Sequence, residues 1–402
     1  MEDAAPEGSV GRQLALQRKL AGLTQQQLAA RIHFSASLIS QVERGVVPAS
    51  PALTSATARA LGTDVEALTG QPYGARISDP RADHAGVPGL RAALDCVDDP
   101  GLSGPPMTAA ELRTRLDECK RDQRRSRYSQ ITAKLPELLQ HTYVVASEAR
   151  PASEAAEAAW ALLDDAYQLA GAVSYSFGYF DLEALTSDRR RDAALRSGDP
   201  LRAAMATGFG ATRLRLCRGD YGRVLRVVER AQSDIADERS SAADAVRAQL
   251  HLRQGITHAR AGAADRADEH ITAAHELVEL GIPAHPYYEV IATPGNVGCY
   301  WVAAPVELTD GTTAVDRAGR VLLPDDEQPS RLGHHWVDVA RAWTLHGDRE
   351  KALDALNRAR RIAPQLTRYH PTVHETVRIL AETERRATDS LAGFARWIGV
   401  QL

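Results

Sequence analysis

Apolar residues spaced three or four positions apart divide the first seventy residues into five predicted helices. Their expected ranges are 10–21, 24–32, 35–44, 51–61 and 63–68. Thr24 and Gln27 form a T-x-x-Q capping box, and Ser35 is an N-cap three residues after the second helix. The three-residue turn between the second and third helices predicts a helix-turn-helix. The expected apolar positions of the first helix are Val10, Leu14, Leu16 and Leu20.

The pattern from Thr108 onward is almost entirely helical and contains internal repeats. In three places a glycine is followed twelve residues later by an alanine: Gly219 and Ala231, Gly262 and Ala274, Gly347 and Ala359. Pro286 and Pro371 lie 24 residues after Gly262 and Gly347, respectively. Small residues at such intervals allow two antiparallel helices to pack closely, and proline interrupts the chain before the next pair. We expect five to seven helical pairs, ending in a capping helix over 388–400.

Composition places the 402-residue chain among ordinary globular proteins, with 44% hydrophobic and 25% charged residues. The absence of a 20-residue apolar run or a leader-like start predicts a cytoplasmic protein without membrane association. Glycine and proline are frequent between the two helical regions. We therefore expect the helix-turn-helix domain over 10–70, a linker over 71–106 and a repeat domain over 107–402.

Net charge is distributed unevenly along the chain. The whole sequence carries −4, but residues 10–61 contain six basic residues and only one acidic residue, Glu43, which gives +5. The remainder therefore carries −9. A basic segment in an acidic chain is the charge distribution expected of a DNA-binding module.

The first domain resembles the DNA-binding domain of phage repressors (the XRE family). The resemblance rests on these positions: Gly22-Leu23-Thr24-Gln25-Gln26-Gln27-Leu28-Ala29, Ser35, Ile39-Ser40, Glu43-Arg44-Gly45 and Pro48. It implies that the third helix enters the major groove of double-stranded operator DNA. The base-facing candidates are Ala36, Ser37, Ser40 and Gln41, and the phosphate-facing candidates are Gln25 and Arg44. The alternative is that these side chains are simply solvated.

Three further residues of this domain receive structural interpretations. Arg18 resembles a family position that braces the domain, and Glu43 is expected to be an internal partner, since a carboxylate would repel phosphate. His33 occupies the turn position where the family usually has glycine. Histidine tolerates a left-handed backbone better than most residues, so the fold prediction stands.

The second region resembles tetratricopeptide repeats, most clearly from Trp343 and Gly347 to Pro371. The fold class expected for the chain is all-α, with a five-helix helix-turn-helix domain followed by a tetratricopeptide-like superhelix. Such a superhelix has a concave groove. The candidate groove residues are Arg213, Gln249, Asn296, His334 and Arg341. Amides suit a peptide backbone and arginine suits a carboxylate, so a peptide or small anionic effector is expected.

Two further clusters have alternative interpretations. Lys120, Arg121, Arg124, Arg125 and Arg127 are either a phosphate-binding face or, as we favour, a solvated helix face beside Asp117 and Glu118. Aromatic residues are either ligand platforms or, as we favour, core: Tyr175, Phe177, Tyr179, Phe180, Tyr287, Tyr288, Tyr300 and Trp301.

Motifs for catalysis, nucleotide binding and metal binding do not stand out. Gly208-Phe209-Gly210 is an incomplete phosphate-loop pattern, and His370 and His374 lack an obvious third ligand. We therefore expect no enzyme activity, cofactor or metal. Our hypothesis is a homodimeric transcriptional regulator whose repeat domain dimerises and senses a peptide or small molecule. The alternative is a protein-interaction scaffold that uses the groove and carries a vestigial DNA-binding head.

Overall fold

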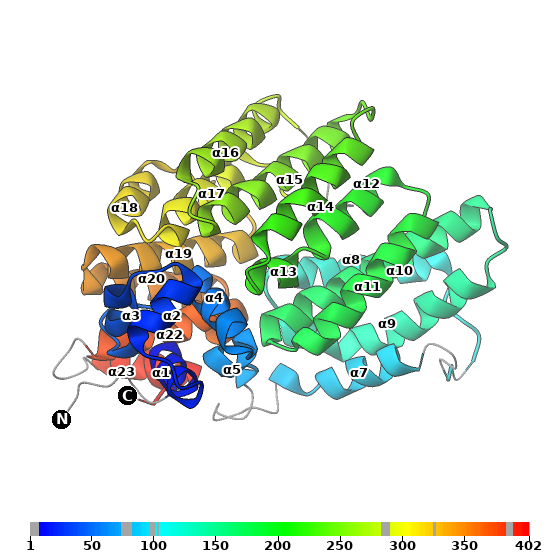
Figure 1. Ribbon diagram of the computed structural model, residues 1–402. Coiled ribbons are helices and arrows are strands. Elements are labelled where there is room, and N and C mark those ends of the chain that lie inside the picture. Colours follow the sequence, from blue (N-terminus) through cyan, green and yellow to red (C-terminus); the bar gives the residue numbers. More distant parts are fainter. Residues whose placement is uncertain are drawn as a thin grey trace.

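The computed structural model describes residues 8–73, 83–96, 101–102, 104–282, 290–324, 327–382 and 389–401. These residues form α-helices and one π-helical segment, and they contain no β-sheet (Figure 1). The predicted all-α fold class is confirmed. None of the described helices has the length and apolar character needed to cross a membrane.

The first five helices form a small domain, which we call the head. They are α1 (Val10–Leu20), α2 (Gln25–Ile32), α3 (Ala36–Glu43), α4 (Pro51–Leu61) and α5 (Val65–Thr69). Leu14, Leu28 and Ile39 are completely buried in its core. Leu16 and Leu20, by contrast, are exposed, because they lie on the face of α1 that turns away from this core.

The remaining helices form the part of the protein that we call the body. Their bounds are α7 (Val87–Asp95), α8 (Ala109–Arg124), α9 (Tyr128–Glu148), α10 (Glu154–Phe177), α11 (Phe180–Arg196), α12 (Pro200–Ala204), the π-helix η2 (Met205–Gly210), α13 (Arg213–Cys217), α14 (Tyr221–Asp234), α15 (Ser241–Arg260), α16 (Ala264–Val278), α17 (Pro294–Glu307), α18 (Gly311–Arg320), α19 (Pro329–His346), α20 (Arg349–Ile362), α21 (Pro364–Tyr369), α22 (Pro371–Glu382) and α23 (Asp389–Ile398). Consecutive helices pack in pairs, with α10 against α11, α15 against α16 and α19 against α20.

The glycine and alanine spacing has a structural counterpart in these pairs. Gly219, Gly262 and Gly347 all have positive φ angles at turns between helices. The three paired alanines are at most 1% exposed, so their small side chains permit close contact between helices. Pro371 begins α22, whereas Pro286 lies outside the described residues.

Part of the predicted linker is packed structure. Helix α7 buries Val87, Leu90 and Leu94 in the same core as α8–α10. A Cβ at Gly86, just before α7, would lie 2.4 Å from the carbonyl oxygen of Thr132, so this backbone approaches α9 very closely. The amphipathic pattern of α7 thus attaches this part of residues 71–106 to the body.

Lys120 corrects our interpretation of the basic cluster as a solvated face. It is 3% exposed, and its ammonium group lies 2.9 Å from Asp165. The same carboxylate is 2.7 Å from Arg202, which also binds Asp164 at 2.8 Å. Buried charges of this kind are paired because leaving one unpaired would be strongly unfavourable. Arg121, Arg125 and Arg127 of the cluster are exposed.

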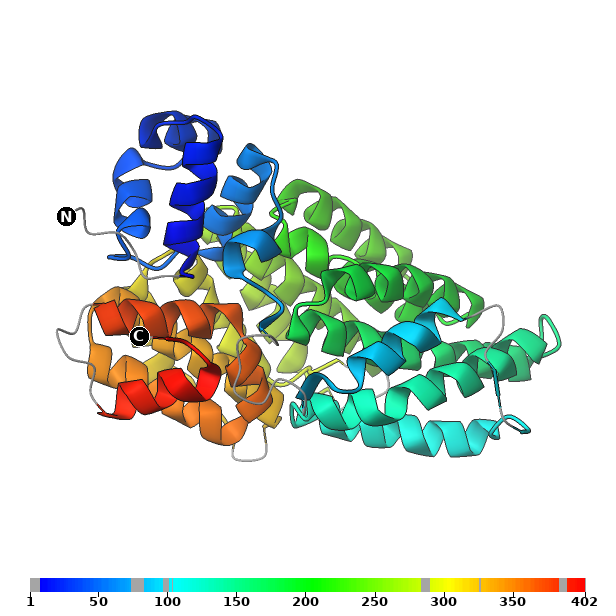
Figure 2. The same cartoon turned by 90° about the horizontal axis from the view of Figure 1, so that it is seen from below.

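The head lies against the C-terminal helices of the body. In the views of Figures 1 and 2, the blue head sits beside the orange and red helices α19–α22 and next to the green helices of the middle of the chain. Segments from the two ends of the sequence are therefore neighbours in space. This arrangement positions both candidate sites described below.

Candidate functional site

The helix-turn-helix unit is built by local hydrogen bonds. The Thr24 hydroxyl accepts from the Gln27 backbone N–H, and the Gln27 side chain accepts from the Thr24 backbone N–H, as the capping box predicts. Ser35 caps α3 by accepting from the Leu38 N–H. His33 has φ 57° and ψ 40°, the left-handed conformation expected at the position usually occupied by glycine. These features set the angle at which α3 leaves α2.

A buried ion pair joins α1 to α3 inside the head. Arg18 donates to both carboxylate oxygens of Glu43, at 2.6 and 2.8 Å, and donates a third hydrogen bond to the carbonyl of Leu23. The predicted structural roles of Arg18 and Glu43 are confirmed. Gln25 donates through Nε2 to the same Glu43 carboxylate at 2.8 Å. Glu43 therefore orients the side chain at the N-terminus of α2.

The candidate base-reading residues lie on the outer side of α3. Ser37 is exposed, while Ala36, Ser40 and Gln41 are partly exposed. Gln41 donates to the Ser37 hydroxyl at 3.2 Å, so these two polar side chains lie next to each other on the surface of α3. Arg44 is exposed at the end of α3. The structure thus gathers the predicted set on one face of the head.

The positive charge of the head is divided between two faces. Arg12, Lys19, Arg31 and Arg44 are exposed. Arg59 instead donates to the carbonyl of Gly219 in the body at 2.9 Å. Its charge contributes to head–body contact, although the sequence sum counted it with the DNA-facing residues.

Hydrogen bonds and ring stacking join the head to the body. The Val10 N–H donates to the buried Glu375 carboxylate at 3.2 Å, and the Ser55 hydroxyl lies 3.2 Å from the Tyr221 hydroxyl. Just beyond α5, the ring of Tyr73 stacks on His374 at a centroid distance of 3.8 Å. These contacts come from the beginning of α1, from α4 and from the segment after α5, and none of them involves α2 or α3.

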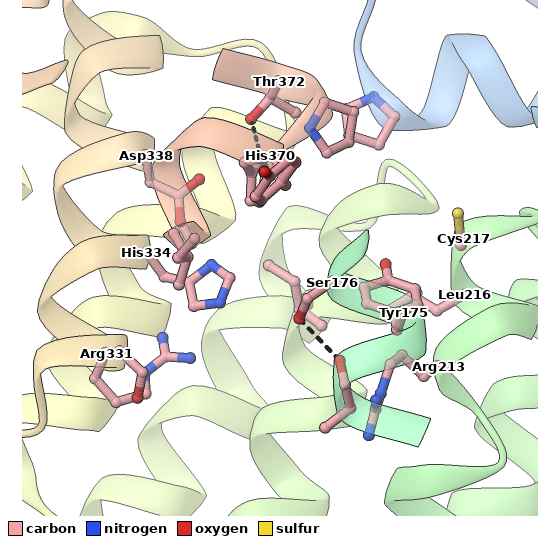
Figure 3. Close-up of a pocket in the computed structure, with 18 of the residues that line it drawn as sticks. Tyr175, Ser176, Arg213, Leu216, Cys217, Arg331, His334, Asp338, His370 and Thr372 are labelled. Atoms are coloured by element: carbon pink, nitrogen blue, oxygen red, sulfur yellow. Dashed lines mark hydrogen bonds between the residues drawn. The ribbon is translucent and has the colours of Figure 1, made fainter. Parts of the chain in front are cut away.

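A cavity of about 470 Å³ lies between the head and the body. All five predicted groove residues line it: Arg213, Gln249, Asn296, His334 and Arg341. Figure 3 shows Arg331, His334 and Asp338 on one wall and Tyr175 and Arg213 on the facing wall, with a helix of the head above them. The repeat offsets therefore bring residues from α13, α15, α17 and α19 together at one place.

Three of these five residues are held by other protein groups. Arg213 lies 3.7 Å from the Glu183 carboxylate and over the Tyr175 ring. Arg341 donates to Glu307 at 3.0 Å and to Asp338 at 2.9 Å. Asn296 donates to the Ile291 carbonyl at 2.6 Å, while its buried Oδ1 has no hydrogen-bond partner. Part of the predicted set thus organises the cavity wall, and the Asn296 oxygen remains as an acceptor.

The histidines of this wall are neutral at pH 7. Burial, with smaller contributions from the charge of Arg331 and from His370, lowers the pKa of His334 well below its usual value. Burial likewise lowers the pKa of His370 to about 4. His374 binds the Arg368 carbonyl through Nε2. The described residues hold no group of three or more His, Cys, Asp or Glu side chains that could bind a metal.

Sequence reasoning missed three arginines in the cavity, Arg253, Arg260 and Arg331. Helical spacing could have found two of them, since Arg253 lies four residues after Gln249 and Arg331 lies three before His334. Residues three or four apart share a helix face. The available signal was therefore the set of residues three or four positions from each predicted groove residue on the same helix.

The aromatic clusters have mixed roles. Phe177 is core at 1% exposure, as favoured. Tyr175, Phe180 and Tyr300 also line the cavity. Tyr287 and Tyr288 lie outside the described residues. The Gly208-Phe209-Gly210 pattern forms part of η2, where Phe209 lines the cavity.

Comparison with known proteins identifies the head alone. A family model described as a helix-turn-helix domain matches residues 9–69. No curated protein and no solved structure matched the chain significantly. The matched range covers α1–α5, whose geometry is described above. Residues 9–69 are therefore a helix-turn-helix domain.

Proposed function

We propose that this protein is a transcriptional regulator whose head binds operator DNA in a sequence-specific manner. The observation that carries the proposal is the exposed polar face of α3 within a matched helix-turn-helix domain. In this class of domain the N-terminal residues of the second helix of the motif contact base edges in the major groove. Ser37 occupies such a position. Gln41 lies one turn further along α3, where it donates to the Ser37 hydroxyl, and glutamine pairs well with adenine.

Gln25 supports a phosphate contact at the N-terminus of α2. One N–H of its amide binds Glu43, which leaves the second N–H for a phosphate oxygen. The N-terminus of a helix also favours anions through its free backbone N–H groups and its dipole. Arg44 is exposed beside the same face and provides a charged phosphate contact.

The position of the head on the body is compatible with DNA binding. The hydrogen bonds to the body come from Val10, Ser55 and Arg59, which are outside α2 and α3. We include in this proposal that the head belongs to the XRE family and that the body is a tetratricopeptide-like repeat domain. It also includes a homodimer, because two heads related by two-fold symmetry would read two half-sites about 34 Å apart.

We further propose that the body senses a peptide or small-molecule effector in the cavity. Polar residues from four separate helices meet there beneath the head. A molecule bound at this place would contact both parts of the protein. Such a position suits a signal that changes how the heads are presented to DNA.

Fluorescence anisotropy with labelled DNA from upstream of the coding sequence tests the proposed function. Unrelated DNA of equal length is the comparison. We expect Gln41→Ala to weaken specific binding by about 10-fold, within the range for one bidentate base contact. Arg44→Gln should weaken both DNAs and reduce the salt slope by about one. Arg230→Gln, an exposed change on α14, is the matched control.

The same experiment decides against the scaffold alternative. Phosphate contacts make affinity fall steeply with salt. Equal affinity for both DNAs, together with no effect of Gln41→Ala, would overturn sequence-specific binding. Weak binding that is insensitive to salt would favour a vestigial head on an interaction scaffold.

A further inference from the structure

The cavity between head and body has walls from both parts of the protein. Val10, Pro51 and Val65 of the head line it, as do residues of α8, α10, α13, α15, α17, α19 and α22. In Figure 3 the head ribbon borders the space above Tyr175 and His370. Its volume of about 470 Å³ lies within the range of pockets that hold small ligands.

The cavity contains more positive than negative side chains. Seven lysines and arginines line it, against three carboxylates, Glu307, Asp338 and Glu375. Arg260 and Arg341 are neutralised by Glu307. Glu375 accepts a hydrogen bond from the backbone of Val10. Lys120 is paired with Asp165, and Arg213 lies 3.7 Å from Glu183. Within the described part of the chain, the cavity cations without a carboxylate within 4.0 Å are therefore Arg124, Arg253 and Arg331.

Arg253 and Arg331 are the cations whose hydrogen bonds are incomplete. Arg253 is 7% exposed, and its hydrogen bond goes to the neutral Phe209 carbonyl at 3.2 Å. Its guanidinium also lies over the Phe209 ring, 4.0 Å from the centroid. The guanidinium of Arg331 lies 5.2 Å from the centroid of the Tyr300 ring. In both arginines the buried Nε has no hydrogen-bond partner.

These two arginines form one electrostatic site. Tyr300 lines the same cavity and interacts electrostatically with both guanidinium groups. Burial lowers the pKa of Arg253 to about 10, which leaves it charged at neutral pH. A buried guanidinium with unmade hydrogen bonds is unfavourable, and an oxyanion supplies the missing acceptors with matching geometry.

The rest of the cavity is suited to an apolar group. Phe180, Leu216 and Ile256 of the body line it together with Val10, Pro51 and Val65 of the head. The apolar part of a ligand would give these side chains partner atoms and the dispersion energy of the contacts. A ligand that fills the space would contact head and body at once and would add to the few hydrogen bonds that join them.

We propose that the cavity binds a small amphipathic anion, whose oxyanion is held by Arg253 and Arg331 and whose apolar part packs between head and body, and that this ligand holds the head in its docked position. This proposal specifies the chemical class of the effector in the proposed function. Only the effect of the ligand on transcription rests on that function. Binding and docking themselves require no DNA.

The binding test uses 1-anilinonaphthalene-8-sulfonate, a fluorescent aromatic anion, with the full-length protein. Dodecanoate should displace the dye, whereas dodecyltrimethylammonium, which has the same chain and opposite charge, should not. Arg331→Gln and Arg253→Gln should each weaken dodecanoate binding by about 10-fold, as expected when a charge-assisted hydrogen bond is lost. Arg230→Gln on the exposed face of α14 should leave it unchanged. Circular dichroism and the urea midpoint verify that each variant is folded, and Arg331→Gln carries the test if Arg253→Gln unfolds.

The docking test is hydrogen exchange with and without dodecanoate. We expect added protection at residues 51–69 of the head and at residues 249–260 of the body. Failure of dodecanoate to displace the dye, equal displacement by the cation, or unchanged affinity in Arg331→Gln would overturn the site. Saturable binding with added protection in the body alone would overturn the docking role. Because both measurements are made without DNA, their failure is distinguishable from a failure of DNA binding.

Discussion

The substitution Glu307→Gln measures how much one buried carboxylate stabilises the body. Glu307 on α17 is 6% exposed and accepts hydrogen bonds from Arg260 at 3.2 Å and from Arg341 at 3.0 Å. Burial by itself would raise its pKa, but the two guanidinium groups outweigh burial and hold the pKa of Glu307 at about 2, compared with 4.5 for the unperturbed group. Glutamine keeps the shape and removes the charge.

The pKa difference sets the expected magnitude and its pH dependence. It corresponds to about 3 kcal/mol of folding free energy at pH 7. Because the folded-state pKa lies below the unfolded value, this stabilisation is fully present above pH 4.5 and is lost as the pH falls toward 2. About 2 kcal/mol of it should remain at pH 3.5. The deficit of the variant should therefore shrink between pH 7 and pH 3.5.

Urea unfolding followed by circular dichroism measures this deficit at both pH values. Asp316→Asn is the matched control, since Asp316 forms an exposed pair with Arg320 at 2.8 Å. An exposed pair contributes about 0–1 kcal/mol, so the control should stay close to the wild-type midpoint. A Glu307→Gln midpoint equal to that of the control, or a deficit that does not change with pH, would refute the reasoning that this carboxylate is needed to neutralise two buried arginines.

Three further substitutions test local features, each by hydrogen exchange of the affected helices and by urea unfolding. Thr24→Ala removes the hydroxyl of the capping box and should destabilise α2 by about 1 kcal/mol, and an unchanged exchange rate over 25–32 would contradict this role. His33→Gly removes the strain of a left-handed backbone at φ 57° and should stabilise the head by about 0.5 kcal/mol. A loss of stability in this variant would contradict strain at this turn. Gly311→Ala would place a Cβ 2.7 Å from the backbone nitrogen of His346 and should destabilise α18 and α19 by about 1–3 kcal/mol, whereas wild-type stability would mean that the helices separate without difficulty.

Much of the head could be predicted from sequence because its determinants are local. The capping box, the serine caps and the left-handed turn involve residues three or four positions apart, so their hydrogen bonds can be inferred from spacing. The same holds for the turn glycines and buried alanines of the body. The five predicted groove residues also line one cavity, and the helical spacing used to choose them was local.

The departures from prediction all depend on long-range contacts. Leu16 and Leu20 fit an apolar helical pattern, yet they are exposed because the core of the small head covers only one side of α1. Lys120 belongs to a basic run, but its burial follows from the position of Asp165 on a different helix. Spacing along the chain carries no information about such partners.

The sequence by itself determined the all-α class, the helix-turn-helix domain and the uneven distribution of charge, because these follow from local hydrogen bonding, helical periodicity and composition. Only the tertiary structure decided where the head rests. Val10 and Glu375 are 365 residues apart and Arg59 and Gly219 are 160 apart, yet each pair shares a hydrogen bond. The cavity arises from that docking, since its walls come from both ends of the chain. The packing of whole surfaces sets such a space, and no short segment of the sequence contains it.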